Sequence, residues 1–253
     1  MDTVYLDFSK AFDKVDQGIF MHKMRKLGIH GSIAIWIHNF LSERTQVLIG
    51  NGAKSTTSDV TSGVPQGTVL GPLLFLIMIN DIDENITDSM ISKFADDTML
   101  TKVITLEEDL EKFQEDLEKL YKWAINNNMA FTGSNFELLR YGHNEELKNL
   151  TNYLTPEADD IIDVKDALGD LGIIMNDKAT LTDHIDKVCS QVKQKSGWIL
   201  CTFQCRRTGF LKQMWKSLVQ GHIDYCSQLY QPLQSRNRER IEMLQKTFNK
   251  RIP

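Results

Sequence analysis

The stretch MISKFADDTMLTKVITLEEDLEKFQEDLEKLYKW, residues 90–123, places two strand-like runs in front of a long helical pattern. The β-rich runs 90–95 and 98–103 lie on either side of Asp96 and Asp97. Such a layout predicts a β-hairpin with two carboxylates at its tip.

The second half of this stretch, from Thr105 to Trp123, has the periodicity of an amphipathic helix. Thr105 and Glu108 have the spacing of a capping box at its start. A hairpin followed by such a helix indicates an α+β fold. The apolar stripe consists of Leu106, Leu110, Phe113, Leu117, Leu120 and Trp123.

The rest of the chain divides into a mixed part, residues 1–177, and a mostly helical part, residues 178–253. In the mixed part, a short buried strand ends at Asp7, and a loop rich in glycine and proline precedes a helix. The fold class expected is therefore an antiparallel sheet with packed helices, followed by a helical domain. Further elements expected are helices at 19–27, 32–41 and 73–80, strands at 45–49, 58–61, 129–131 and 136–141, and two short strands around Gly169.

Charge is distributed unevenly along the chain. The formal net charge is -5, yet the segment from Lys187 onward carries thirteen Lys and Arg residues against Asp224, Glu239 and Glu242. A basic end on an acidic body indicates a polyanion contact confined to that end. Solvated helix faces are the alternative explanation.

The composition is that of an ordinary globular protein, with 42% hydrophobic and 25% charged residues. No apolar run reaches the roughly 18 residues of a membrane span, and no signal-peptide pattern is present, so we expect an intracellular protein. Four cysteines give no disulfide framework and are expected to be reduced. Zinc binding is the alternative for three of the cysteines and a histidine, because they are closely spaced in two pairs. These residues are Cys201, Cys205, His222 and Cys226.

Three carboxylates are candidate metal ligands: Asp7 after the first strand, and Asp96 with Asp97 at the hairpin tip. If these strands are neighbours, the three groups can bridge two Mg²⁺ ions, the arrangement used in phosphoryl transfer. An Asp-Asp pair is also common in turns for its own hydrogen bonding. The pair alone therefore does not decide between a metal site and a turn.

Several motifs together resemble the reverse transcriptases of non-LTR, LINE-like (jockey-type) retrotransposons. They follow in the order expected for that family, and the resemblance runs from residue 4 nearly to the end. The motifs are LDFSKAFDKVD (6–16), SGVPQGTVLGPLLF (62–75), Asn80-Asp81, FADDT (94–98), LGDLG (168–172), Tyr225-Cys226 and IEMLQKTF (241–248).

The resemblance implies a polymerase palm over residues 1–177 and a thumb over residues 178–253. It implies that Asp7, Asp96 and Asp97 are catalytic and bind two Mg²⁺ ions, with Mn²⁺ as an alternative. The implied activity is RNA-directed DNA polymerisation, by two-metal nucleotidyl transfer to a primer 3′-hydroxyl. The implied partners are an RNA template, a DNA primer and a deoxynucleoside triphosphate, in a nuclear and cytoplasmic ribonucleoprotein without a membrane.

The resemblance also assigns four substrate-binding residues. The backbone at Phe8 would lie along the triphosphate, and Phe12 would sit under the sugar and exclude a 2′-hydroxyl. Gln66 would contact the nucleotide, and Gly67 would allow close backbone approach. A core aromatic and a turn residue are the alternatives for Phe12 and Gln66, respectively.

In the basic end, four cations are candidates for contact with the primer–template backbone in a thumb: Arg206, Arg207, Lys212 and Lys216. Aromatic residues lie among them, which suits nucleic-acid binding. Core packing is the alternative for these aromatic side chains: Trp198, Phe203, Phe210 and Trp215.

The sequence departs from the family pattern in two places. Only Met1-Asp2-Thr3 precede the first strand, so the chain is expected to be truncated before the fingers. Asn135 stands where the family has a lysine that protonates the departing pyrophosphate, and the role of the nearby Arg140 is open. General acids contribute typically about 10²–10⁴-fold, so loss of the lysine would slow the enzyme without abolishing metal catalysis. Together, the missing fingers and Asn135 leave an inactive remnant that at most binds nucleic acid as the alternative. A group II intron or telomerase-like polymerase fits the motifs less well.

Overall fold

The computed structural model describes residues 1–131, 136–142, 152–156, 160–230 and 235–252. The chain forms two compact units, Met1–Lys165 and Asp166–Pro253. The division lies at residue 165 rather than at 177, so the hairpin expected at the end of the first domain belongs to the second unit.

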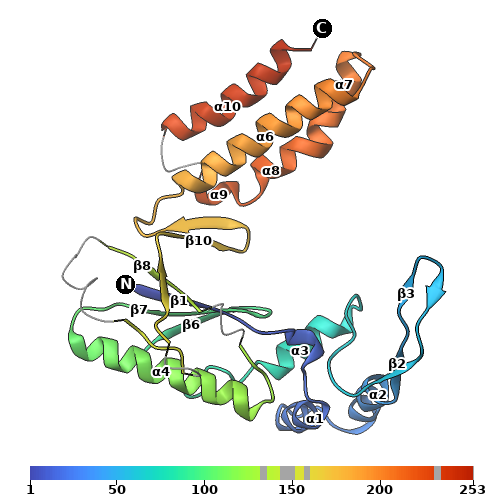
Figure 1. Ribbon diagram of the computed structural model, residues 1–253, viewed down its shortest axis with the longest axis vertical. Helices are drawn as coiled ribbons and strands as arrows, with labels where there is room; N and C mark the ends of the chain where they lie inside the picture. The colour runs from blue at the N-terminus through green and yellow to red at the C-terminus, as the bar shows by residue number, and fades with distance from the viewer. Residues whose placement is uncertain (132–135, 143–151, 157–159, 231–234, 253) are drawn as a thin grey trace. The chain divides into compact units, whose positions relative to one another are not determined.

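A five-stranded sheet organises the first unit (Figure 1). Strand β1 (Asp2–Asp7) lies in its middle. Neighbouring strands run antiparallel except β8 and β9, which pair in parallel. The sheet order is β6 (Met90–Phe94), β7 (Asp97–Lys102), β1, β8 (Glu137–Arg140) and β9 (Asp163–Lys165).

The two faces of β1 differ because side chains alternate along a strand. Val4 and Leu6 are buried in the hydrophobic core. Thr3 and Asp7 belong to the other face. The hydroxyls of Thr3 and of Thr101 on β7 lie 3.1 Å apart, so the two strands place their alternate residues on the same sides.

The long helix α4 (Glu107–Asn126) packs its apolar stripe into the core on one side of the sheet (Figure 1). The predicted stripe is confirmed from Leu110 to Trp123, but Leu106 is exposed. The predicted capping box was wrong. Asp109, not Glu108, accepts hydrogen bonds from Thr105 N, Thr105 Oγ1 and Leu106 N, and these bonds lower the pKa of Asp109 to about 2.

Three shorter helices complete the core of this unit: α1 (Gln17–Lys26), α2 (Gly31–Leu41) and α3 (Leu70–Met78). A partly buried polar network connects α1, the loop after α3, and α4. Lys23 Nζ donates to Asp81 Oδ1 at 2.5 Å, and Trp123 Nε1 donates to the same oxygen at 3.0 Å. Desolvation by burial lowers the pKa of Lys23. The Asp81 of the Asn80-Asp81 motif therefore has a structural role.

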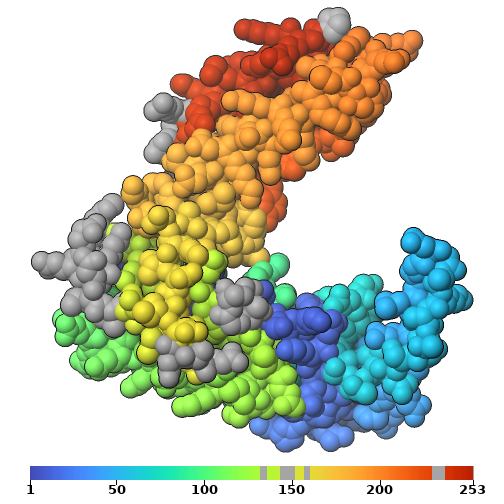
Figure 2. Space-filling model, viewed as in Figure 1, coloured from blue at the N-terminus to red at the C-terminus, as the bar shows by residue number. Residues whose placement is uncertain are grey.

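A hairpin segment projects from the first unit after α2 (Figures 1 and 2). The outer pair, β3 (Ile49–Gly50) and β4 (Ala53–Lys54), is joined by the predicted Asn51-Gly52 turn. The inner pair consists of β2 (Arg44–Gln46) and β5 (Ser58–Val60).

The second unit begins with a hairpin of β10 (Ala167–Asp170) and β11 (Ile173–Asn176). The two predicted strands are present, but their turn lies at Leu171 and Gly172, and Gly169 lies within β10 rather than between the strands. Helix α6 (Thr182–Thr202) follows, and an apolar core joins it to the later helices. These are α7 (Thr208–Trp215), the π-helical η3 (Lys216–Gln220), α8 (Gly221–Asp224), α9 (Ser227–Tyr230) and α10 (Ser235–Lys250).

Among the helices of the described residues, none is both long and apolar enough to cross a lipid bilayer.

Candidate active site

The three predicted metal ligands lie at the same end of the neighbouring strands β1 and β7. This end of the sheet, with Asp7, Asp96 and Asp97, is called the acidic edge below. Asp7 and Asp97 are directly paired across β1 and β7. Directly opposed residues of antiparallel strands point to the same face. The β6–β7 turn brings Asp96 next to this pair, and Ala95 in that turn has a φ of 53°. Asp7 and Asp97 therefore lie on the sheet face opposite to Val4 and Leu6.

A hollow of about 470 Å³ adjoins this edge. It is lined by two of the predicted metal ligands and all four of the predicted substrate-binding residues. Segments far apart in the sequence thus converge on one place. The complete lining is Asp7, Phe8, Lys10, Ala11, Phe12, Pro65, Gln66, Gly67, Pro72 and Asp96.

Two loops form the wall of this hollow, and backbone hydrogen bonds join them. Gly63 N donates to Val15 O, and Val64 N donates to Phe12 O, both at 2.8 Å. The contact is so close that a Cβ at Gly63 would lie 2.7 Å from Asp13 O. Only glycine fits here, since φ of Gly63 is also +80°.

The Pro65–Gly71 turn is fixed to the start of α3 by Thr68. Its Oγ1 donates to Pro65 O at 2.8 Å and accepts from Gly71 N at 3.0 Å. Gly67, within this turn, has a φ of +76°, and the space beside its Cα is open. The predicted close backbone approach at Gly67 is sterically feasible.

The two aromatic candidates differ in their environment. Phe8 is 3% exposed and stacks on Phe131 with ring centroids 4.3 Å apart, so its side chain belongs to the core. Only its backbone remains available for substrate. Phe12 is half-buried and stacks on Phe75 at 4.6 Å. Phe12 therefore borders both the core and the hollow.

Gln66 is held in place by a residue that the sequence analysis did not single out. Gln66 Nε2 donates to Asp13 Oδ1 at 3.0 Å. Arg44 connects the same loop to the end of α2. Its Nη2 donates to Ser62 O and Gly63 O, and its Nε donates to Leu41 O. Asp13 lies within the quoted LDFSKAFDKVD motif, whereas no sequence signal pointed to Arg44.

The donor chemistry of the acidic edge suits Mg²⁺. In the described residues, no three Asp, Glu, His or Cys side chains lie together in a group that could hold a metal ion by themselves. Mg²⁺ does not require one, because it usually binds one or two carboxylates and completes its shell with water and substrate phosphates. Asp7, Asp96 and Asp97 provide carboxylates of this kind at one open edge.

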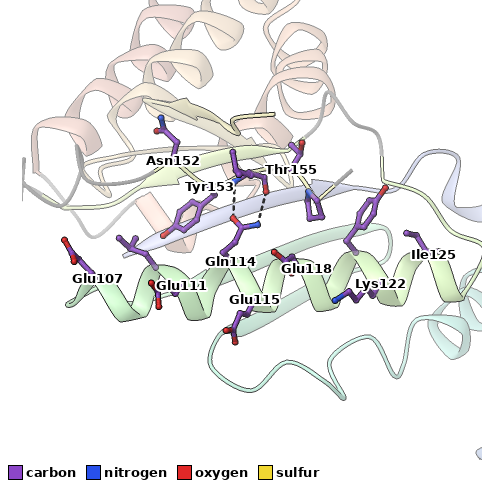
Figure 3. A pocket seen from close by; sticks show the side chains of 14 residues that line it. Glu107, Glu111, Gln114, Glu115, Glu118, Lys122, Ile125, Asn152, Tyr153 and Thr155 are labelled. Carbon is purple, nitrogen blue, oxygen red and sulfur yellow. Dashed lines mark hydrogen bonds between the residues drawn. The ribbon is translucent and has the colours of Figure 1, made fainter. Parts of the chain in front are cut away.

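A larger hollow of about 870 Å³ lies along α4 (Figure 3). Gln114 there exchanges two hydrogen bonds with the backbone of Leu154. The lining is acidic, so it repels phosphates and is a poor candidate for nucleotide binding. The glutamates that line it are Glu107, Glu111, Glu115 and Glu118.

Arg140 does not lie near the acidic edge. It pairs with Asp2 in register, and its Nε lies 3.5 Å from Asp2 Oδ2, beside the buried Tyr153. Asp2 and Asp7 are five residues apart on β1, or roughly 17 Å. Arg140 is thus too far away to replace the family lysine from this position. Asn135 lies outside the described residues.

The four predicted nucleic-acid-binding cations are all exposed. Arg206 and Arg207 directly precede α7, while Lys212 and Lys216 are four residues apart and share a helical face. The aromatic residues among them do not all lie in the core: Trp215 is buried, but Trp198 is 53% exposed.

Two other sequence motifs meet in the second unit. The Tyr225 hydroxyl donates to Leu171 O at 2.6 Å, which joins the Tyr225-Cys226 motif to the LGDLG hairpin. All four cysteines are free thiols. Among the residues that the structure describes, Cys201, Cys205 and Cys226 belong to no metal-ligand cluster.

Comparison with known protein families identifies the family of this chain. The family model described as reverse transcriptase (RNA-dependent DNA polymerase) matches residues 3–138, which carry both loops and the acidic edge. The chain belongs to the reverse transcriptase family. The prediction drawn from the motifs is confirmed.

Relatives of this reverse transcriptase chain include proteins of mobile elements. It is 27% identical to the RNA-directed DNA polymerase from mobile element jockey of Drosophila melanogaster, over 98% of the chain and 28% of that protein. It is 23% identical to the probable RNA-directed DNA polymerase from transposon X-element of the same organism, over 96% of the chain and 27% of that protein. The chain thus spans little more than a quarter of these relatives.

Two solved structures align with the chain at TM-scores below 0.5. A foamy viral protease-reverse transcriptase in complex with dsDNA aligns with a TM-score of 0.44 and 16% identity, over 98% of this chain and 42% of that chain. An apo telomerase from Candida tropicalis aligns with a TM-score of 0.41 and 13% identity, over 71% of this chain and 34% of that chain.

Proposed function

We propose that this chain is the RNA-directed DNA polymerase domain of a non-LTR retrotransposon, which extends a primer 3′-hydroxyl with deoxynucleotides. The observation that carries the proposal is the convergence of Asp7, Asp96, Phe12 and Gln66 on one hollow. These residues come from three separate sequence motifs, and the fold brings them together at the edge of one sheet.

Asp7, Asp96 and Asp97 would hold two Mg²⁺ ions. When bound, such ions activate the attacking hydroxyl and stabilise the leaving oxygen of an in-line displacement. The carboxylates are the protein's contribution to this arrangement. Their direct pairing across β1 and β7 fixes the spacing of Asp7 and Asp97 in the backbone, because strand register leaves little freedom.

The two loops position the incoming nucleotide. The ring of Phe12 stacks on Phe75, so a 2′-hydroxyl on the nucleotide could not easily push the Phe12 ring aside. Gln66 is oriented by its hydrogen bond to Asp13. With one amide N–H engaged, Gln66 keeps its carbonyl oxygen and a second N–H for the substrate.

The second unit would contact the primer–template through Arg206, Arg207, Lys212 and Lys216. Their exposure supports this assignment, because phosphate contacts require accessible cations. The half-exposed Trp198 offers a surface on which a base can stack.

The proposal is tested by primer extension on a poly(A) RNA template with an oligo(dT) primer, dTTP and Mg²⁺. The parent chain is compared with the Asp96→Ala/Asp97→Ala variant. The matched control is Glu111→Ala/Glu115→Ala, which removes two exposed carboxylates from α4. Circular dichroism verifies that all three proteins fold.

Extension by the parent and the control, but not by the variant of the acidic edge, is the expected result. Extension that survives in the acidic-edge variant would show that the polymerising site lies elsewhere or in a contaminant. No extension by any of the three, with all folded, would overturn the polymerase proposal for this chain. A gel-shift experiment would then measure whether it still binds the primer–template.

A further inference from the structure

Lys10 occupies a distinctive place in the candidate site. It lies between Asp7 and the 3₁₀ turn η1 (Ala11–Asp13), and it lines the same hollow as Asp7 and Asp96. Within the described residues it is the one cationic side chain in that lining. The other charged groups there are the two carboxylates.

The backbone of Lys10 has an unusual conformation for a lysine. Its φ and ψ are 52° and 48°, in the left-handed region. Its carbonyl accepts hydrogen bonds from Asp13 N and Lys14 N, which hold the residue in this conformation. Glycine or asparagine adopts such a conformation at lower cost, so the fold alone does not explain a lysine here.

The ammonium group of Lys10 is also available for a ligand. The side chain is exposed, and it makes no hydrogen bond or ion pair with the part of the chain that the structure describes. The neighbouring cation Arg44 is different, because three backbone carbonyls engage its guanidinium. Lys10 is therefore the cation of this site that is free to meet substrate.

We propose that Lys10 binds the triphosphate of the incoming nucleotide; this inference rests on the proposed polymerase function. A triphosphate that approaches Asp7 and Asp96 meets two like charges. These carboxylates would hold metal ions that offset the repulsion, and Lys10 adds a positive charge that belongs to the protein itself. A lysine suits the task because its compact ammonium has three donors on a flexible stem.

The test uses Lys10→Gly, which removes the charge and places at this position the residue that best tolerates its φ. Lys14→Gln is the matched control, since it removes a positive charge four residues away and outside the lining of the hollow. Isothermal titration calorimetry measures dTTP and dTMP binding to each protein. The measurement uses Mg²⁺ and a primer–template whose primer ends in a dideoxynucleotide, so that no extension occurs.

The expected result is a loss of about tenfold in dTTP affinity for Lys10→Gly, the size of one charge-assisted hydrogen bond at an exposed site. Binding of dTMP should be unchanged, and the melting temperature should not fall, because glycine tolerates this backbone conformation. The Lys14→Gln control should match the parent. In primer extension, the KM for dTTP should rise about tenfold while kcat is nearly constant.

Equal dTTP affinity in Lys10→Gly and the parent would overturn the inference. An equal loss in the Lys14→Gln control would also overturn it, because the effect would then reflect general charge. A fall in melting temperature for Lys10→Gly would show a structural role instead. If the parent neither binds dTTP nor extends a primer, the polymerase proposal itself fails. If the parent extends and Lys10→Gly matches it, only the role of Lys10 is refuted.

Discussion

Substitution of Gly63 by alanine should destabilise the first unit and impair the candidate site together. A Cβ at this position would lie 2.7 Å from Asp13 O and 2.8 Å from both Asp13 Cα and Phe12 O. All three atoms belong to the backbone, so no side-chain rotation can relieve the overlap. The loop must move away from residues 12–15, and the hydrogen bonds of Gly63 N and Val64 N weaken with it.

The expected magnitude has two contributions. The φ of +80° costs an alanine roughly 1 kcal/mol. Overpacking against fixed neighbours costs a further 1–3 kcal/mol or so. The free energy of unfolding should therefore fall by about 2–4 kcal/mol, which corresponds to a melting temperature lower by roughly 4–16 °C for a unit of this size.

Gly67→Ala is the matched control for this prediction. Gly67 has nearly the same φ, +76°, but a Cβ there meets no atom within 4 Å. Its cost should be limited to the conformational part, about 1 kcal/mol. Urea unfolding followed by circular dichroism compares the two variants. Equal stabilities for Gly63→Ala and Gly67→Ala would refute the inferred close contact between the loops.

Two further predictions concern pH and salt. The hydrogen bonds at the start of α4 lower the pKa of Asp109 from 3.8 to about 2, so its stabilisation is complete above pH 4 or so and disappears as the pH falls toward 2. Asp109→Ala should therefore have a lower melting temperature than the parent at pH 7 and the same melting temperature near pH 2. A difference in melting temperature that does not change with pH would contradict this prediction. Lys212→Ala/Lys216→Ala should reduce the slope of log affinity for duplex against log salt by up to about 1.8. The Lys246→Ala/Lys250→Ala control on α10 should leave the slope unchanged. An equal reduction in both variants would argue against a specific contact by Lys212 of α7 and Lys216 of η3.

The elements that the sequence predicted well are those with strong local signals. The hairpin around Asp96 and Asp97 and the helix stripe from Leu110 to Trp123 both appear as expected. Their periodicities differ clearly, and each element buries one face. The resemblance implied that Asp7 acts together with Asp96 and Asp97, and the strand register pairs Asp7 directly with Asp97, which the sequence had left as a condition.

The features that the sequence did not predict depend on tertiary contacts or on fine local geometry. The spacing of Thr105 and Glu108 suggested a capping box, but Asp109 is better placed to accept three hydrogen bonds. Arg140 is close to Asn135 in sequence, yet strand pairing places it next to Asp2. The contact of Gln66 with Asp13 spans 53 residues and leaves no local pattern.

The central position of β1 has a consequence for how the protein is made. The ribosome synthesises β1 before either neighbour, and its partners β7 and β8 begin only at Asp97 and Glu137. Translation proceeds at about 5–20 residues per second, so the nearer partner strand, β7, is synthesised several seconds after Val4 and Leu6. Pairings of such long sequence separation also slow folding. The nascent chain therefore exposes its future core strand during translation, and chaperones that bind short apolar segments should increase the yield of folded protein.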